Sequence, residues 1–214
     1  MPFSEKFLQA LTRQQVQGDF PPFTLGNPEK VERYLHKLVA ELQRQRHWLV
    51  EADFGHYGSG YASYVPITLS KADKSDAVTT TRQGGITTDT TGLRLYVSRL
   101  APYWFYGQGW WSRTTENGRN VSGASNYLRP ADRAAIDQAR WQADCWQLEA
   151  ILTNFRYGLL TPEELEQPAP ASITRIPTEL ADPPYQVFDC FFTGPTDAAP
   201  RRAQRLLPVQ AVPH

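Results

Sequence analysis

The stretch Leu93–Trp111 constrains the fold of this chain more than any other segment. It holds three of the six tryptophans and the densest apolar run. Over Leu93–Ser98 the apolar side chains alternate with polar ones, which is the pattern of a half-buried strand. Proline cannot donate to a strand ladder, so Pro102 ends or bends this strand. The sequence therefore predicts a sheet strand on each side of Pro102.

The residues after Pro102 predict a further strand and turn. Tyr103–Tyr106 is typical of a strand, and Gly107–Gly109 predicts a turn into Trp110–Arg113. We expect these segments to form the centre of an antiparallel sheet. Other strands are expected over residues 48–54, 61–69 and 185–192. The threonine-rich segment 77–91 fits either two edge strands or a long loop, and 119–126 is expected to be a loop.

Helix signals are clearest near the N-terminus and in the third quarter of the chain. Ser4 can cap a short helix that ends near Gln17. Asn27 followed by Pro28 predicts the start of a second helix, whose apolar residues continue to Leu42. Thr161 with Pro162 predicts a short helix later in the chain.

Pro130 predicts the start of a long helix over residues 130–157. It carries two apolar stripes, which indicate burial over much of its circumference. We therefore expect it to pack across the sheet, with both Trp146 and Leu148 buried.

These elements predict an α+β protein. An antiparallel sheet of roughly five to seven strands is packed by N-terminal helices and by the long helix 130–157. Residues 1–197 are expected to form one domain. Ten of the 17 prolines lie at or after Pro162, and residues 198–214, which include three arginines, are expected to form an extended proline-containing tail.

Composition narrows the classes of function. Hydrophobic residues make up 41% of the chain, which is enough for a packed core, and 22 basic residues balance 22 acidic ones. A neutral chain has no general attraction for nucleic acid or anionic membranes. The N-terminal residues do not resemble a signal peptide, and no apolar run is long enough to cross a membrane. We expect a cytoplasmic protein.

Metals and cofactors are not expected. The two cysteines, Cys145 and Cys190, are far apart in sequence, and the four histidines lack the spacing of a zinc site. No fingerprint for a nucleotide cofactor is present. We interpret both cysteines as buried, reduced thiols.

The glycine-rich segment Gly55–Gly60 is the most site-like loop. His56 could act as a base and Ser59 as a nucleophile, with Asp53 or Asp89 as the acid of a hydrolase. A hairpin connection explains the same residues, because catalytic triads rarely come from one short loop. The alternative function is therefore a small hydrolase that uses Asp53, His56 and Ser59.

Acidic residues offer a second catalytic possibility. Glu51 and Asp53 share a strand face, and Asp89 and Glu116 could approach them from loops. Paired carboxylates can hydrolyse glycosides, although surface acids are the simpler interpretation.

The aromatic residues of the central sheet suggest binding. Strand alternation sends adjacent tryptophans to opposite faces, so one of Trp110 and Trp111 is expected to stay outside the core. An exposed tryptophan beside an arginine has the composition of an interface hot spot. We expect the partner-binding residues to be Trp110, Trp111, Arg113, Trp104 and Arg94.

The sequence favours a non-enzymatic cytosolic protein that binds another protein through this aromatic-rich surface, as an immunity protein or an adaptor does. The alternatives are the small hydrolase and a carbohydrate- or nucleotide-binding module. The oligomeric state is open.

Overall fold

The computed structural model describes residues 3–55, 62–82, 85–176 and 182–194. Its helices are α1 (Glu5–Thr12), η1 (Phe23–Leu25), α2 (Pro28–Gln43), η3 (Pro130–Arg133), α3 (Gln138–Asn154), α4 (Pro162–Leu165) and α5 (Val187–Phe191). Its strands are β1 (Trp48–Ala52), β2 (Tyr64–Lys71), β3 (Ala77–Arg82), β4 (Gly85–Ser98), β5 (Tyr103–Glu116), β6 (Arg119–Ser125) and β7 (Gly158–Leu159). His56, Ser59 and the predicted tail 198–214 lie outside the described residues.

The described strands form a single sheet with the order β1-β2-β4-β5-β6. β2 and β3 both pair with β4, so they follow one another along the same side of that long strand. These pairings are antiparallel, and only the short β7 joins β5 in parallel. The expectation of an α+β fold built on an antiparallel sheet is confirmed. The threonine-rich segment forms β3 and the first half of β4, which agrees with the strand alternative. Only β3 is an edge strand, because this half of β4 pairs with β3 on one side and with β5 on the other.

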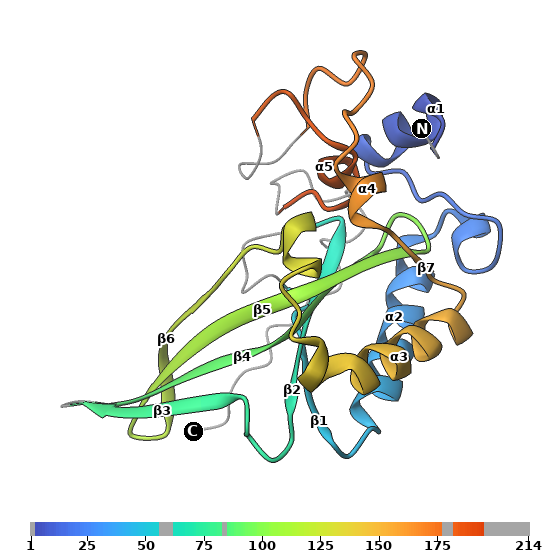
Figure 1. Ribbon diagram of the computed structural model, residues 1–214. Helices are drawn as coiled ribbons and strands as arrows, with labels where there is room; N and C mark the ends of the chain where they lie inside the picture. The colour runs from blue at the N-terminus through green and yellow to red at the C-terminus, as the bar shows by residue number, and fades with distance from the viewer. Residues whose placement is uncertain (1–2, 56–61, 83–84, 177–181, 195–214) are drawn as a thin grey trace, which may run out of the picture.

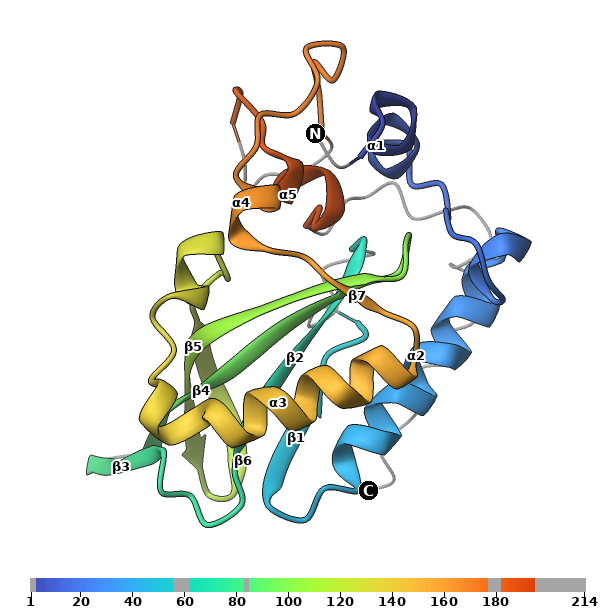
Figure 2. The ribbon, with the colours of Figure 1, turned by 45° about the vertical axis from the view of Figure 1, so that its right-hand side comes forward.

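Two helices cover one face of the sheet. Leu93, Leu95 and Val97 of β4 pack there, together with Trp104 and Tyr106 of β5, in one core cluster with α2 and α3. Figure 2 shows α2 and α3 lying across this face. The alternation predicted for Leu93–Ser98 is therefore confirmed, because the odd-numbered side chains all point into this core. The strand is not half-buried as predicted, since Tyr96 and Ser98 on the other face are fully buried too.

A second core fills the opposite face, but only at one end. Tyr96 and Phe105 point there and pack with residues of α1, α4 and α5. Figure 1 shows these three helices gathered at the end of the sheet that is far from β3 and β6. In Figure 1 the halves of β4 and β5 that pair with β3 and β6 extend beyond the helices.

Helix ends follow the local capping signals. The Ser4 hydroxyl accepts a hydrogen bond from the Phe7 backbone, and the Asn27 side chain accepts from Glu29 and Lys30. Each replaces a partner that the first helical turn lacks. Thr161 caps α4 through a reciprocal pair of bonds with Glu164. These three predicted helix starts are confirmed, but the first helix ends at Thr12 and not near Gln17.

The long helix 130–157 is shorter than predicted. Pro130 begins the short helix η3, and α3 starts only at Gln138. One predicted stripe is buried, including Trp141 and Leu148, but Trp146 on the other stripe is 65% exposed. The prediction that Trp146 is buried was wrong, because this helix lies on the surface of the sheet with a single face against it.

The prediction of a turn at Gly107–Gly109 is also wrong, since these residues lie inside β5, a single strand of 14 residues. These glycines are required by close packing. A Cβ atom on Gly107 would lie 2.8 Å from the Asp132 carbonyl carbon, and one on Gly109 would lie 2.7 Å from Cβ of Arg94. The observed turn is at Asn117 and Gly118, where φ is positive, as expected for turn residues.

Two other local assignments differ. Residues 119–125 form the edge strand β6 and not a loop. Their backbone groups pair with β5, and their small polar side chains have little strand propensity by which the sequence could predict this. The segment 185–192 holds the buried helix α5 in place of a strand. A short apolar run has no period that separates a buried strand from a buried helix.

Within the described part of the chain, no helix has the length and apolar character needed to cross a membrane.

Candidate binding surface on the concave sheet face

The sheet curls toward the face that carries Glu51 and Arg113. Glu51 is level with Thr68, Arg94 and Gly107 in the register of successive strands. Arg113 lies six residues farther along β5 and three strands away, so a flat sheet would separate the two Cα atoms by about 24 Å. The Arg113 Nη2 and Glu51 Oε2 atoms are nevertheless 2.5 Å apart. Strong curvature makes this face concave.

The bend is centred on a cross-strand glycine pair, Gly92 and Gly109. A Cβ atom on Gly92 would lie 2.4 Å from the Leu69 carbonyl oxygen and 2.7 Å from Cη2 of Trp111. Gly92 thus lies on the inside of the bend, where only hydrogen fits. Glycine at such a position lets a strand kink and another backbone approach closely.

The concave face holds a groove of about 290 Å³. Its apolar lining includes the exposed Leu49 and the ring of Trp111. Arg113 lies in the wall, and its two terminal nitrogens donate to the two carboxylate oxygens of Glu51. The remaining lining is rich in hydroxyl groups, from Thr68, Ser70, Thr79, Thr88, Thr90 and Thr115.

The predicted partner-binding residues fall on two faces and in the core. Trp111 and Arg113 line the groove, but Trp110, 48% exposed, lies on the opposite face. Trp104 is only 1% exposed and stacks on Tyr106 with ring centres 4.9 Å apart. Because this ring lies in the core under α3, Trp104 is not a surface contact.

Arg94 is a further correction to the predicted surface. It is 8% exposed, and its Nη1 donates to the Asn126 carbonyl oxygen over 2.7 Å. This bond ties the central strand β4 to the segment that follows β6. Its Nε has no hydrogen-bond partner among the described residues. The Arg94 side chain is therefore packed within the sheet and is not part of the exposed surface.

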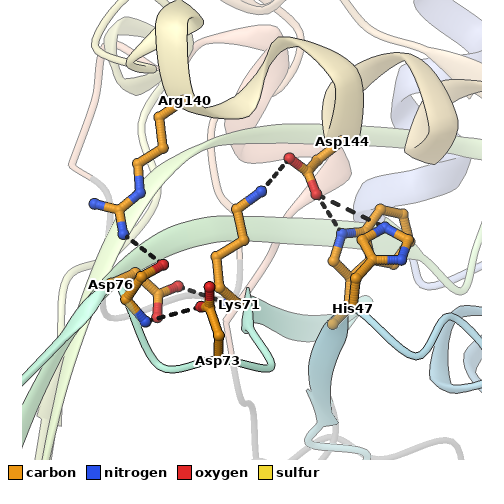
Figure 3. A network of polar contacts seen from close by, with 8 residues as sticks. His47, Lys71, Asp73, Asp76, Arg140 and Asp144 are labelled. Atoms are coloured by element: carbon orange, nitrogen blue, oxygen red, sulfur yellow. Dashed lines mark hydrogen bonds and ion pairs between the residues drawn. The ribbon is translucent and has the colours of Figure 1, made fainter.

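A polar network joins one end of the groove to α3 (Figure 3). Lys71 lines the groove, and its ammonium group forms an ion pair with the buried Asp144 of α3. The other Asp144 oxygen accepts a hydrogen bond of 2.6 Å from the Trp48 indole. Lys71 also lies 4.5 Å from the centre of the Trp141 ring. The network therefore fixes β1 and β2 against α3, at the rim of the groove.

The loop between β2 and β3 is held by its own carboxylates (Figure 3). Asp73 accepts from the Ser75 backbone, and this hydrogen bond lowers the pKa of its carboxyl group. Asp76 is 6% exposed, and one of its oxygens accepts from the Lys71 backbone over 2.7 Å. The other oxygen, Oδ1, has no hydrogen-bond partner among the described residues, although Asp76 lines the groove.

The described residues do not bring the catalytic candidates together. Asp53 Oδ1 accepts a hydrogen bond from the Gly55 backbone, as in an ordinary turn, and His56 and Ser59 lie outside the described residues. The Glu51 carboxylate is paired with Arg113. Asp89 and Glu116 are exposed, and the strand register places them on the face opposite Glu51.

Neither a reactive thiol nor a metal site is found among the described residues. Burial raises the pKa of Cys145 to about 11 and that of Cys190 to about 12, which disfavours the reactive thiolate. Among the residues that the structure describes, no cluster of histidine, cysteine and acidic side chains could hold a metal ion.

Sequence reasoning missed Leu49 and considered Glu51 only as one of a pair of catalytic carboxylates. Leu49 is an apolar residue on the outward side of β1, and Glu51 follows it at the same-face spacing of two. That spacing can be recognised in the sequence, but the curvature that brings β1 opposite β5 depends on the bend at Gly92.

Comparisons with protein-family models, with curated proteins and with solved structures gave no match to this chain.

Proposed function

We propose that the protein is a non-enzymatic binding protein that holds another protein against its concave sheet face. The observation that carries this proposal is the groove, where an exposed leucine, an aromatic ring and a bidentate ion pair meet on a face that no described helix covers at this end. Aromatic and arginine side chains in such settings dominate the energy of protein interfaces.

The Glu51–Arg113 pair suits a partner that brings its own charges. Its side chains are 58% and 43% exposed, so the pair contributes little to folding stability. An incoming protein can shield the pair from water or re-pair either member. The net charge of zero supports a protein partner over nucleic acid, because a strong basic field is absent.

The wider setting that we propose is cytoplasmic, with a role like that of an immunity protein that blocks a toxin or an adaptor that holds a client. Both roles need a preformed surface and no catalytic group. The curled sheet supplies such a surface, since its shape is set by backbone pairing and by glycine packing.

The test compares groove variants with a variant on the opposite face. A partner captured from an extract of the native host is purified, and its affinity is measured by calorimetry for Leu49→Ala, Trp111→Ala and Arg113→Glu. Each change should weaken binding at least about tenfold, as expected for interface hot spots. The Leu49→Ala protein should unfold at nearly the wild-type denaturant concentration, because Leu49 is 45% exposed.

Trp110→Ala is the matched control, since this tryptophan lies on the other face. It should bind like the wild type. If Trp110→Ala loses binding while the three groove variants retain it, the concave face is not the interface.

A saccharide ligand is the second candidate for the same groove. The hydroxyl-rich lining and the Trp111 ring match a polyol with an apolar face. Binding of an immobilised glycan library that is lost in Trp111→Ala, with no protein captured, would favour this candidate over a protein partner.

A further inference from the structure

β6 forms one edge of the sheet that the structure describes. Arg119–Ser125 ends the strand order, and all seven of its residues are exposed. Among the described residues, no other strand pairs with its outer side. It lies at the end of the sheet away from α1, α4 and α5 (Figure 1).

The backbone groups that point outward can be assigned from the ladder. The Asn126 amide donates to the Trp110 carbonyl. Antiparallel pairs alternate between bonded and non-bonded positions, so Ala124 and Ser122 direct their backbone groups toward β5. Gly123 and Ser125 therefore direct their N–H and C=O groups outward, where a further strand would meet them.

This edge has one of the usual protections against pairing and lacks the others. A β-bulge lies opposite Thr114 and Thr115, where Val121 has no partner on β5, but Ser122–Ser125 pairs regularly. Natural edge strands also carry lysine, proline or inward charges that prevent other strands from adding. Asn120–Ser125 contains neither a charged residue nor proline. The side chains of Ser122–Ser125 are small, and Gly123 has none, which allows a second backbone to approach closely. Val121 adds an apolar side chain that is 51% exposed.

We propose that β6 pairs antiparallel with β6 of a second copy of this chain, around a two-fold axis at Gly123. Gly123 then exchanges both backbone hydrogen bonds with Gly123 of the second copy. In this register Ser122 faces Ala124 of the second copy, and Val121 faces Ser125. The contact is isologous, so it closes as a dimer and leaves the concave groove of each copy open.

The charges of the strand agree with a second copy as the occupant. Arg119 is the one charged residue of β6. In the register centred on Gly123, the two Arg119 residues lie at opposite ends of the paired strands, eight positions apart, which is about 26 Å. That separation exceeds the screening length of about 8–10 Å at ordinary salt. No like charges meet across the contact.

The dimer should be weak, because one strand pair buries less area than the roughly 1,200 Å² of a stable interface. Analytical ultracentrifugation of the full chain, at concentrations up to about 1 mM, should show the mass rising from 24.3 kDa toward twice that value. Ser122→Lys places two lysines only two positions apart in the paired strands and should lower the association constant at least tenfold. The matched control Thr80→Lys adds the same charge to the exposed edge strand β3 and should leave association unchanged.

Amide hydrogen exchange gives a second readout in the same protein. The outward amides of Gly123 and Ser125 should exchange more slowly as concentration rises, whereas the Ala124 amide, bonded to β5, should not change. A protein that stays monomeric at every concentration would overturn the proposal, as would a dimer that survives Ser122→Lys. Trp111→Ala should dimerise normally, so a failure here is separate from a failure of the groove as a partner site.

Discussion

At the scale of single residues, the two tryptophans of α3 show how strongly the helix face decides the effect of a side chain. Trp141 is 1% exposed and packs in the core under the helix, whereas Trp146, five residues later, is 65% exposed. Trp141→Ala should lower the free energy of unfolding by about 3–5 kcal/mol, because it leaves a cavity. Trp146→Ala should change it by less than about 0.5 kcal/mol. Urea unfolding of the two variants checks both values, and equal losses would contradict the assigned helix face.

Asp144 makes a different residue-scale prediction, since its charge is buried. Its carboxylate binds the Lys71 ammonium group and the Trp48 indole. Asp144→Leu leaves Lys71 without its anion and should cost about 3 kcal/mol of unfolding free energy. Adding Lys71→Met removes the stranded charge and should recover about 2 kcal/mol, because the lost Trp48 acceptor still costs about 1 kcal/mol.

The double-mutant cycle is measured by denaturant unfolding. A loss below about 1 kcal/mol for Asp144→Leu, or no recovery in the double variant, would mean that the ion pair does not anchor α3 to the sheet.

At the scale of elements, local capping residues determine where three helices begin, whereas tertiary packing determines the structure of α5. α1, α2 and α4 begin where their capping residues predict, since a side-chain acceptor at the N-cap is a local property. The apolar run of α5 is too short to show a helical period, and it was predicted as a strand. It is helical because its short apolar run is buried against β4, β5 and α1, with Asp189 accepting from the Gln186 backbone at its start.

The bend in β4 and β5 is an element-scale feature with its own prediction. Gly92→Ala places a Cβ atom against the Leu69 carbonyl oxygen and the Trp111 ring, and backbone cannot move away easily. We expect a loss of about 1–3 kcal/mol in unfolding free energy. Gly55→Ala is the control, because its nearest neighbour would be 3.9 Å away, and it should be nearly neutral. A neutral Gly92→Ala in thermal and urea unfolding would show that the bend does not depend on this glycine.

At the scale of the whole molecule, the two cores explain where a surface is available. Helices α2 and α3 cover one face, and α1, α4 and α5 cover the other face only at one end. Curling of the remaining sheet brings β1 opposite β5 and creates the groove between them. The same arrangement leaves β6 at an open edge. The groove and the edge are thus separate consequences of one sheet that is longer than the helices that cover it (Figures 1 and 2).

The sequence by itself determined the features that depend on neighbours along the chain. Alternation placed Leu93, Leu95 and Val97 in the core, capping residues located three helix starts, and the neighbouring tryptophans 110 and 111 were expected on opposite faces. Each of these follows from the period of a strand or from the missing partners of a helix end.

Only the tertiary structure decided which faces are covered. Trp104 and Arg94 are buried because neighbouring strands and helices cover them. Trp146 is exposed because only the opposite side of its helix contacts the sheet. Glu51 and Arg113 meet although 62 positions separate them, since their contact depends on the register of four strands and on the glycine bend. Such long-range contacts arise from the summed packing of many elements, which no local period encodes.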